Sequence, residues 1–214
     1  MTEGLESSAV PRIRVRIESL SDLVFGLALS FGSLILIGSQ PRNGTDLLVN
    51  VFIFGFSFMI VVWTWIGYTR TVAVLPGEAP FALPLNLGLL FCVALEPYLF
   101  YVAITAKTVE LADPASIAYG LDAGLMFLFL AGLGYLVVKQ GRSRREDNRL
   151  HPVVLNRFRR FMKLQAIVGG IYIASALPIF WIDTPIGPPR FLLWSSPFII
   201  LTAFRKPKSN PDAK

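Results

Sequence analysis

Residues 16–38 read RIESLSDLVFGLALSFGSLILIG, and this stretch decides the fold class of the chain. It carries no charge between Asp22 and Gly38, and a helix needs about 20 mostly apolar residues to cross a bilayer. A carboxylate inside such a span costs about 2.5–3.5 kcal/mol at the bilayer centre and less near an interface. The stretch therefore predicts a membrane-spanning helix whose polar start, from Arg16 to Asp22, packs against polar partners or lines a path.

Apolar and charged segments alternate in the same way along the rest of the chain. Of the 214 residues, 54% are hydrophobic and only 16% are charged, against roughly 25% charged in ordinary soluble domains. We predict an all-α, polytopic membrane protein, with six transmembrane helices in a domain over 12–206 and disordered tails over 1–11 and 207–214. The six spans are predicted near 20–39, 47–69, 81–105, 116–138, 163–182 and 190–205.

Basic residues predict the orientation of these spans. All but three of the 20 lysines and arginines fall on one side of the predicted membrane, and the exceptions are Arg42, Lys107 and Arg190. Because positively charged segments stay inside, both termini are predicted in the cytoplasm and the protein in the cell membrane. The net charge of +6 concentrates in the loop between spans four and five, which indicates anionic membrane lipids as a partner rather than nucleic acid.

The sequence offers little for catalysis. Its single cysteine, Cys92, lies in an apolar span, and its single histidine, His151, lies in the basic loop. The chain has no glycine-rich phosphate loop, no Ser/His/Asp set and no spacing of metal ligands. We therefore expect no enzyme activity, no cofactor and no metal site.

Polar residues of three predicted spans meet at one depth near the cytoplasmic side. Given alternating directions for the spans, this layer contains Arg16, Ser21, Asp22, Trp65, Tyr68 and Asn86. For Ser21, Asp22 and Asn86 we favour a structural hydrogen-bond network between helices. For the two aromatic residues alone, anchoring at the membrane interface is the favoured interpretation.

The first span has two distinct faces. Small and polar residues recur at Asp22, Gly26 and Ser30, a spacing that lets a second helix approach closely. A bulky stripe lies about 100° further around the helix and contains Leu23, Leu27, Phe31 and Leu34. Facing lipid or core is the default for such a stripe, whereas around a symmetry axis it would form apolar rings that can gate ions by dewetting. Periodicity does not choose between the two.

Two acids, Glu96 and Asp122, interrupt the outer halves of spans three and four at matching depth. Consecutive antiparallel spans are usually neighbours, so the two carboxyl groups are predicted to lie near each other. Either a water-filled vestibule faces both, or they form a buried pair that shares a proton.

The chain resembles the prokaryotic branch of the transmembrane protein 175 family of endosomal and lysosomal potassium channels. Three segments carry the resemblance: Arg16-x-x-x-Leu20-Ser21-Asp22, Ser57-Phe58 followed by Trp65 and Tyr68, and Asn86-Leu87 followed by Glu96-Pro97-Tyr98. The family pattern has Phe where Leu20 stands, His where Tyr68 stands and Ile where Leu27 stands.

This resemblance implies a homotetramer in which the four first helices line a central pore for potassium ions. The constriction would fall at Leu27, five positions after Asp22, with Phe31 and Leu34 as further rings and Ser30 as a polar pore residue. Arg16, Ser21 and Asp22 are implied to hold the helix ends. The structural network of the motifs also includes Leu20, Trp65, Tyr68 and Asn86.

Three functions follow as hypotheses. The first is a potassium-permeable or weakly selective cation channel with an apolar constriction. The second is a proton-linked transporter or proton leak that uses Glu96 and Asp122. The third is a membrane scaffold without transport. Regularly spaced arginines of the voltage-sensor kind are absent from the spans, so steep voltage gating is not expected.

Overall fold

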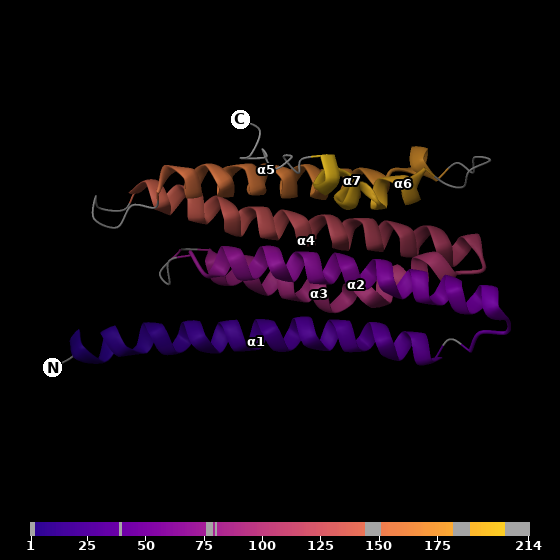
Figure 1. The fold of residues 1–214 in the computed structure, drawn as a ribbon, viewed down its shortest axis with the longest axis horizontal. Coiled ribbons are helices and arrows are strands. Elements are labelled where there is room, and N and C mark those ends of the chain that lie inside the picture. The colour runs from indigo at the N-terminus through magenta and orange to yellow at the C-terminus, as the bar shows by residue number, and fades with distance from the viewer. Residues whose placement is uncertain are drawn as a thin grey trace, which may run out of the picture.

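The computed structural model describes residues 3–38, 40–75, 79, 81–143, 151–181 and 189–203, and within them the chain forms helices and no strand. The elements are α1 (Glu3–Gly38), α2 (Gly44–Val72), α3 (Ala82–Thr105), α4 (Val109–Ser143), α5 (Pro152–Ser175), the 3-10 turn η2 (Pro178–Phe180), α6 (Arg190–Trp194) and α7 (Ser196–Ala203). Successive long helices run antiparallel to one another (Figure 1).

Among the described residues, four helices are long and apolar enough to cross a membrane. They are Ile17–Gly38, Gly44–Val72, Ala82–Thr105 and Val109–Gly141, each of at least 22 residues. The all-helical class is therefore confirmed for the described residues. The four helices are compatible with a multi-pass membrane protein, and they agree with the first four predicted spans.

The last two predicted spans are not confirmed in the described part of the chain. The α5 helix begins at Pro152 instead of 163, and its first half carries Arg157, Arg159, Arg160 and Lys163. It ends at Ser175, shortly before Pro178, because proline supplies no backbone N–H and disfavours a helical residue before it. The predicted helix over 190–205 is divided into α6 and α7, since Pro197 is accommodated only in the first turn of a new helix.

The N-terminal end also differs from its prediction. The α1 helix begins at Glu3, so it includes residues assigned from sequence to a disordered tail. Extending an existing helix costs less than nucleating one, which favours this earlier start. The predicted C-terminal tail over 207–214 lies outside the described residues.

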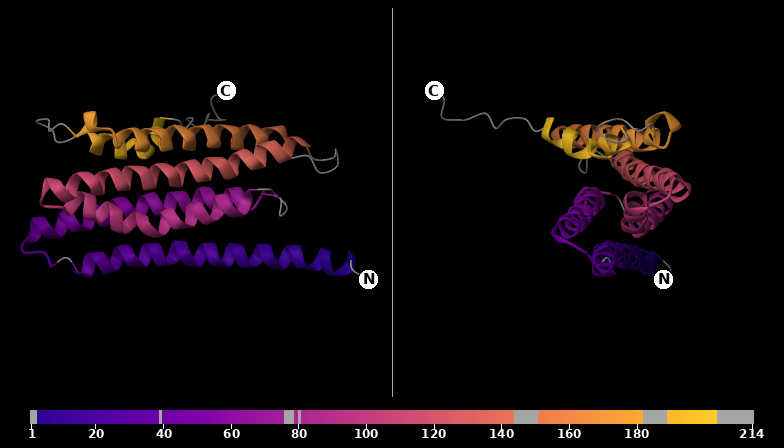
Figure 2. Two further views of the ribbon diagram at one scale, coloured as in Figure 1. Left: turned by 180° about the vertical axis from the view of Figure 1, so that it is seen from behind. Right: turned by 90° about the vertical axis from the view of Figure 1, so that its right-hand side faces the viewer.

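The helices form a stack with α1 at one edge and α5–α7 at the other (Figures 1 and 2). Only 17% of the α1 span is buried, against 67% of the α4 span. Phe25 and Ala28 lie on the face of α1 that packs against the core, and Phe25 contacts Tyr68 with ring centroids 5.5 Å apart. Val24 and Leu29 also pack against the core, whereas the opposite face of α1 is exposed.

Candidate functional site

The bulky stripe of α1 points away from the bundle. Leu23, Leu27, Phe31 and Leu34 are all between 51% and 59% exposed. Ser30 is also exposed, and its hydroxyl donates to the Gly26 carbonyl oxygen at 2.9 Å. The candidate pore residues therefore lie together on an exposed face of the molecule and are not part of the core of a single chain.

The small-residue face predicted for close helix packing lies on the open side as well. Asp22, Gly26 and Ser30 are exposed, and a Cβ atom at Gly26 would meet nothing within 4 Å. Ser30 and Ser33 satisfy their hydroxyls on the helix's own carbonyls, so they need no neighbouring helix. Close approach within the chain occurs instead at Gly32, where a Cβ atom would lie 3.3 Å from the Phe54 ring.

Ser21 is the centre of the polar layer. The Tyr68 hydroxyl of α2 donates to Ser21 Oγ at 2.6 Å, and the Asn86 amide of α3 donates to the same atom at 3.5 Å. Ser21 in turn donates to the Ile17 carbonyl oxygen at 2.8 Å. All three side chains are buried, so one hydroxyl joins three helices.

Asp22 and Trp65 form the exposed part of the same layer. The indole Nε1 of Trp65 donates to Asp22 Oδ1 at 3.1 Å. Leu20 is 47% exposed and takes no part in the layer, while the side chain of Arg16 lies outside the described residues. The structure thus brings together Ser21, Asp22, Trp65, Tyr68 and Asn86 from the predicted set.

A cleft of about 170 Å³ opens beside this layer between α1 and α2. Glu18 and Asp22 line it from α1, with Tyr68 and Thr69 from α2. Sequence reasoning missed Glu18, although its spacing of four residues from Asp22 places both carboxylates on one helix face.

Glu96 and Asp122 are both inside the bundle. Glu96 is fully buried, and Ser57 of α2 donates to its Oε2 at 2.7 Å. Asp122 is 7% exposed and lies against the Cys92 thiol. Neither Glu96 Oε1 nor Asp122 Oδ2 has a hydrogen-bond partner among the described residues. The two acids are close enough for their charges to interact.

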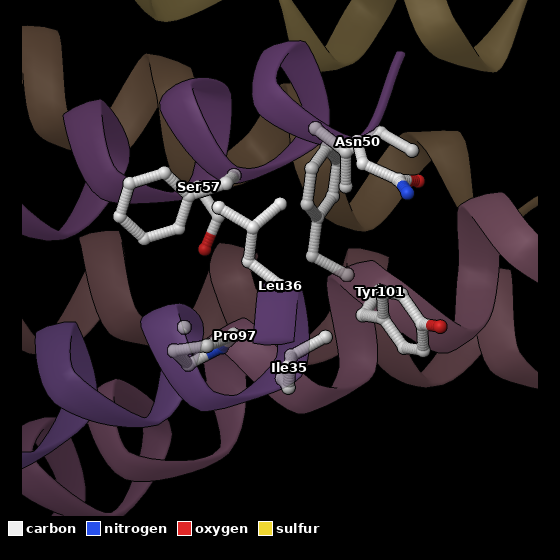
Figure 3. A pocket seen from close by; sticks show the side chains of 10 residues that line it. Ile35, Leu36, Asn50, Ser57, Pro97 and Tyr101 are labelled. Atoms are coloured by element: carbon white, nitrogen blue, oxygen red, sulfur yellow. The ribbon is translucent and has the colours of Figure 1, made fainter. Parts of the chain in front are cut away.

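A second cleft leads towards this pair. It is formed by α1, α2 and α3, and its lining includes Gly32, Asn50, Ser57, Pro97 and Tyr101 (Figure 3). Its volume of about 20 Å³ has room for one water molecule. Sequence reasoning did not predict the contact between Ser57 and Glu96. Ser57 lies about as far from the C-terminal end of α2 as Glu96 lies from the N-terminal end of α3, and these two ends lie at the same side of the bundle.

Aromatic side chains close the bundle beyond the buried acids. Tyr119 packs against Trp194 with ring centroids 4.6 Å apart, and the Tyr172 hydroxyl donates to the Trp194 carbonyl oxygen at 2.6 Å. Trp194 itself donates to Ser175 Oγ at 3.0 Å. These contacts attach α6 to α4 and α5.

Comparison with protein-family models, with curated proteins and with solved structures finds no match for this chain. The function is therefore argued from the geometry described above and from the resemblance in sequence.

Proposed function

We propose that the protein is a cation channel of the cell membrane, permeable to potassium or weakly selective, whose pore is lined by α1 of four copies. The carrying observation is the exposed apolar stripe on α1, at the edge of the stack. A helix that buries one face in its own chain and presents the other is suited to line a shared axis. No cofactor is needed for such a pathway.

In this proposal Leu27 forms the narrowest ring, and Phe31 and Leu34 form the next two. Leu27 and Phe31 are separated by about 6 Å along the helix, at 1.5 Å per residue. Rings of apolar side chains at this spacing exclude water from a narrow passage until the helices move apart. Ser30 supplies a hydroxyl between the rings, which favours a partly dehydrated cation.

The polar layer has a positioning role in the same proposal. Ser21, Tyr68 and Asn86 fix the start of the α1 span against α2 and α3, and Asp22 with Trp65 extends the contact to the surface. Truncating Asp22 should therefore impair assembly more than ion selectivity.

We further propose that both termini are cytoplasmic and that the chain crosses the membrane six times. The α5 helix would form the fifth crossing together with the apolar residues that follow it, and its basic start would lie at the cytoplasmic surface. Support comes from the distribution of lysine and arginine, because the end of the bundle that holds the N-terminus also holds the basic start of α5 (Figure 1).

Potassium flux into liposomes tests the channel. Purified wild-type protein should carry potassium, and Leu27→Ala should raise the flux several-fold because it widens the narrowest ring. Leu125→Ala is the matched control, since Leu125 is 42% exposed near the middle of α4. Absence of protein-dependent flux, or equal flux in the two variants, would reject the channel.

A second function, proton-linked transport or a proton leak, is favoured by one observation. Glu96 and Asp122 each keep a buried carboxyl oxygen without a partner among the described residues. Glu96→Gln should then abolish flux driven by a pH gradient, whereas Glu110→Gln, at an exposed acid near the start of α4, should not. Unchanged flux in Glu96→Gln would end this second hypothesis.

A further inference from the structure

No positively charged side chain is among the described groups that interact with Glu96 or Asp122. Among the described residues, the other titratable groups whose charges interact with the two carboxyls are Cys92 of α3, Tyr119 of α4 and Tyr172 of α5. Ser57 of α2 faces Glu96 as a neutral donor. Two ionised carboxylates in an apolar interior would repel each other and would lose their hydration.

The second cleft opens between α1, α2 and α3, and its lining includes Ser57, the hydrogen-bond partner of Glu96. Its lining residues come from the last two turns of α1, the second to fourth turns of α2 and the C-terminal half of α3. Its inner end reaches the Ser57 hydroxyl, which points into the cavity in Figure 3 and is bound to Glu96. Asn50 and Tyr101 provide further polar groups along the lining.

We infer that Glu96 and Asp122 form a proton-binding site within the bundle, and that the second cleft supplies its protons through the Ser57 hydroxyl. The site takes a proton as its ligand because no described side chain offers a cation to neutralise the pair. Proton binding at this site does not require that protons then cross the membrane, so the site goes beyond both functions proposed above.

The transfer step is balanced in atoms and charge. A hydronium ion in the cleft gives a proton to Ser57 Oγ while the hydroxyl proton of Ser57 moves to Glu96 Oε2. The products are a water molecule, a neutral serine and a neutral carboxylic acid. The 2.7 Å separation of Ser57 Oγ and Glu96 Oε2 is short enough for this transfer.

Infrared spectroscopy of the purified protein in lipid at neutral pH tests the site. The wild type should show a carbonyl band of a protonated carboxylic acid, which Glu96→Gln removes and Glu110→Gln leaves in place. Should Glu96→Gln fail to fold, Ser57→Ala provides the reading, because loss of its hydrogen bond should shift the band. If no protonated-acid band depends on Glu96 or Ser57, Glu96 does not take up a proton through Ser57 and the inference is overturned.

Deuterium exchange of the same band tests the route. Gly32→Ala places a Cβ atom 3.3 Å from Phe54 in the lining of the cleft, whereas at Gly26, on the same helix, a Cβ atom meets nothing within 4 Å. Transfer into heavy water should shift the band several-fold more slowly in Gly32→Ala than in Gly26→Ala. Equal rates would overturn the role of the cleft. Both readings are independent of ion flux, so they separate this inference from the proposed channel.

Discussion

At the scale of single residues, buried hydroxyl groups make hydrogen bonds that join one helix to another. Depth along antiparallel spans was enough to predict that Ser21, Tyr68 and Asn86 share a layer, because helical rise fixes depth. It did not predict that Leu20 faces outward or that Ser57 binds Glu96, because both depend on how each helix is rotated. Rotation is set by packing with neighbours, which a single sequence does not display.

The Tyr68 hydroxyl should contribute measurably to stability. Tyr68→Phe removes the 2.6 Å hydrogen bond to Ser21 and keeps the ring contact with Phe25. We expect a loss of about 0.5–1.5 kcal/mol in the free energy of unfolding, seen as a lower melting temperature of the purified protein. Tyr98→Phe is the control, because Tyr98 is 59% exposed on α3. Equal melting temperatures for the two variants would contradict a structural role for the layer.

At the scale of elements, the first four spans follow directly from long uncharged runs, and the last two do not. Each of the two predicted spans after Lys163 looks like one continuous apolar run, but Pro178 interrupts the helical hydrogen bonding in the first and Pro197 in the second. Hydropathy averages over these prolines, so it joins segments that the backbone keeps separate. The close approach of α4 and α5 is equally invisible in hydropathy, since it depends on two facing glycines.

The Gly124–Gly169 contact between α4 and α5 should tolerate no side chain. A Cβ atom at Gly169 would lie 2.9 Å from the Gly124 carbonyl oxygen, so the helices would have to separate. We expect Gly169→Ala to lower the free energy of unfolding by about 1–3 kcal/mol in denaturation of the detergent-solubilised protein. A Cβ atom at the adjacent Gly170 meets nothing within 4 Å, so Gly170→Ala should cause no loss. Equal destabilisation by both would show that this contact is not tight.

At the scale of the whole molecule, membrane class and antiparallel order could be predicted from composition and charge. The position of α1 at the edge of the stack could not be predicted, because the spacing of its bulky stripe fits a packed core, a lipid-facing surface or a pore lining. The structure shows that the stripe is not core: Leu27 and Phe31 are more than half exposed. The choice that remains is between lipid and other copies of the chain, and it is open to a direct test.

Cross-linking of single cysteines should separate these two environments. On a Cys92→Ala background, Leu27→Cys places one thiol per copy on the stripe, while Leu125→Cys places one on an exposed face of α4. If four α1 helices surround a pore, a short bifunctional maleimide should join Leu27→Cys copies in pairs, because each thiol reacts once. The same reagent should leave Leu125→Cys monomeric on a denaturing gel. A stripe that faces lipid would give monomers in both variants, and the shared pore would then have to be abandoned.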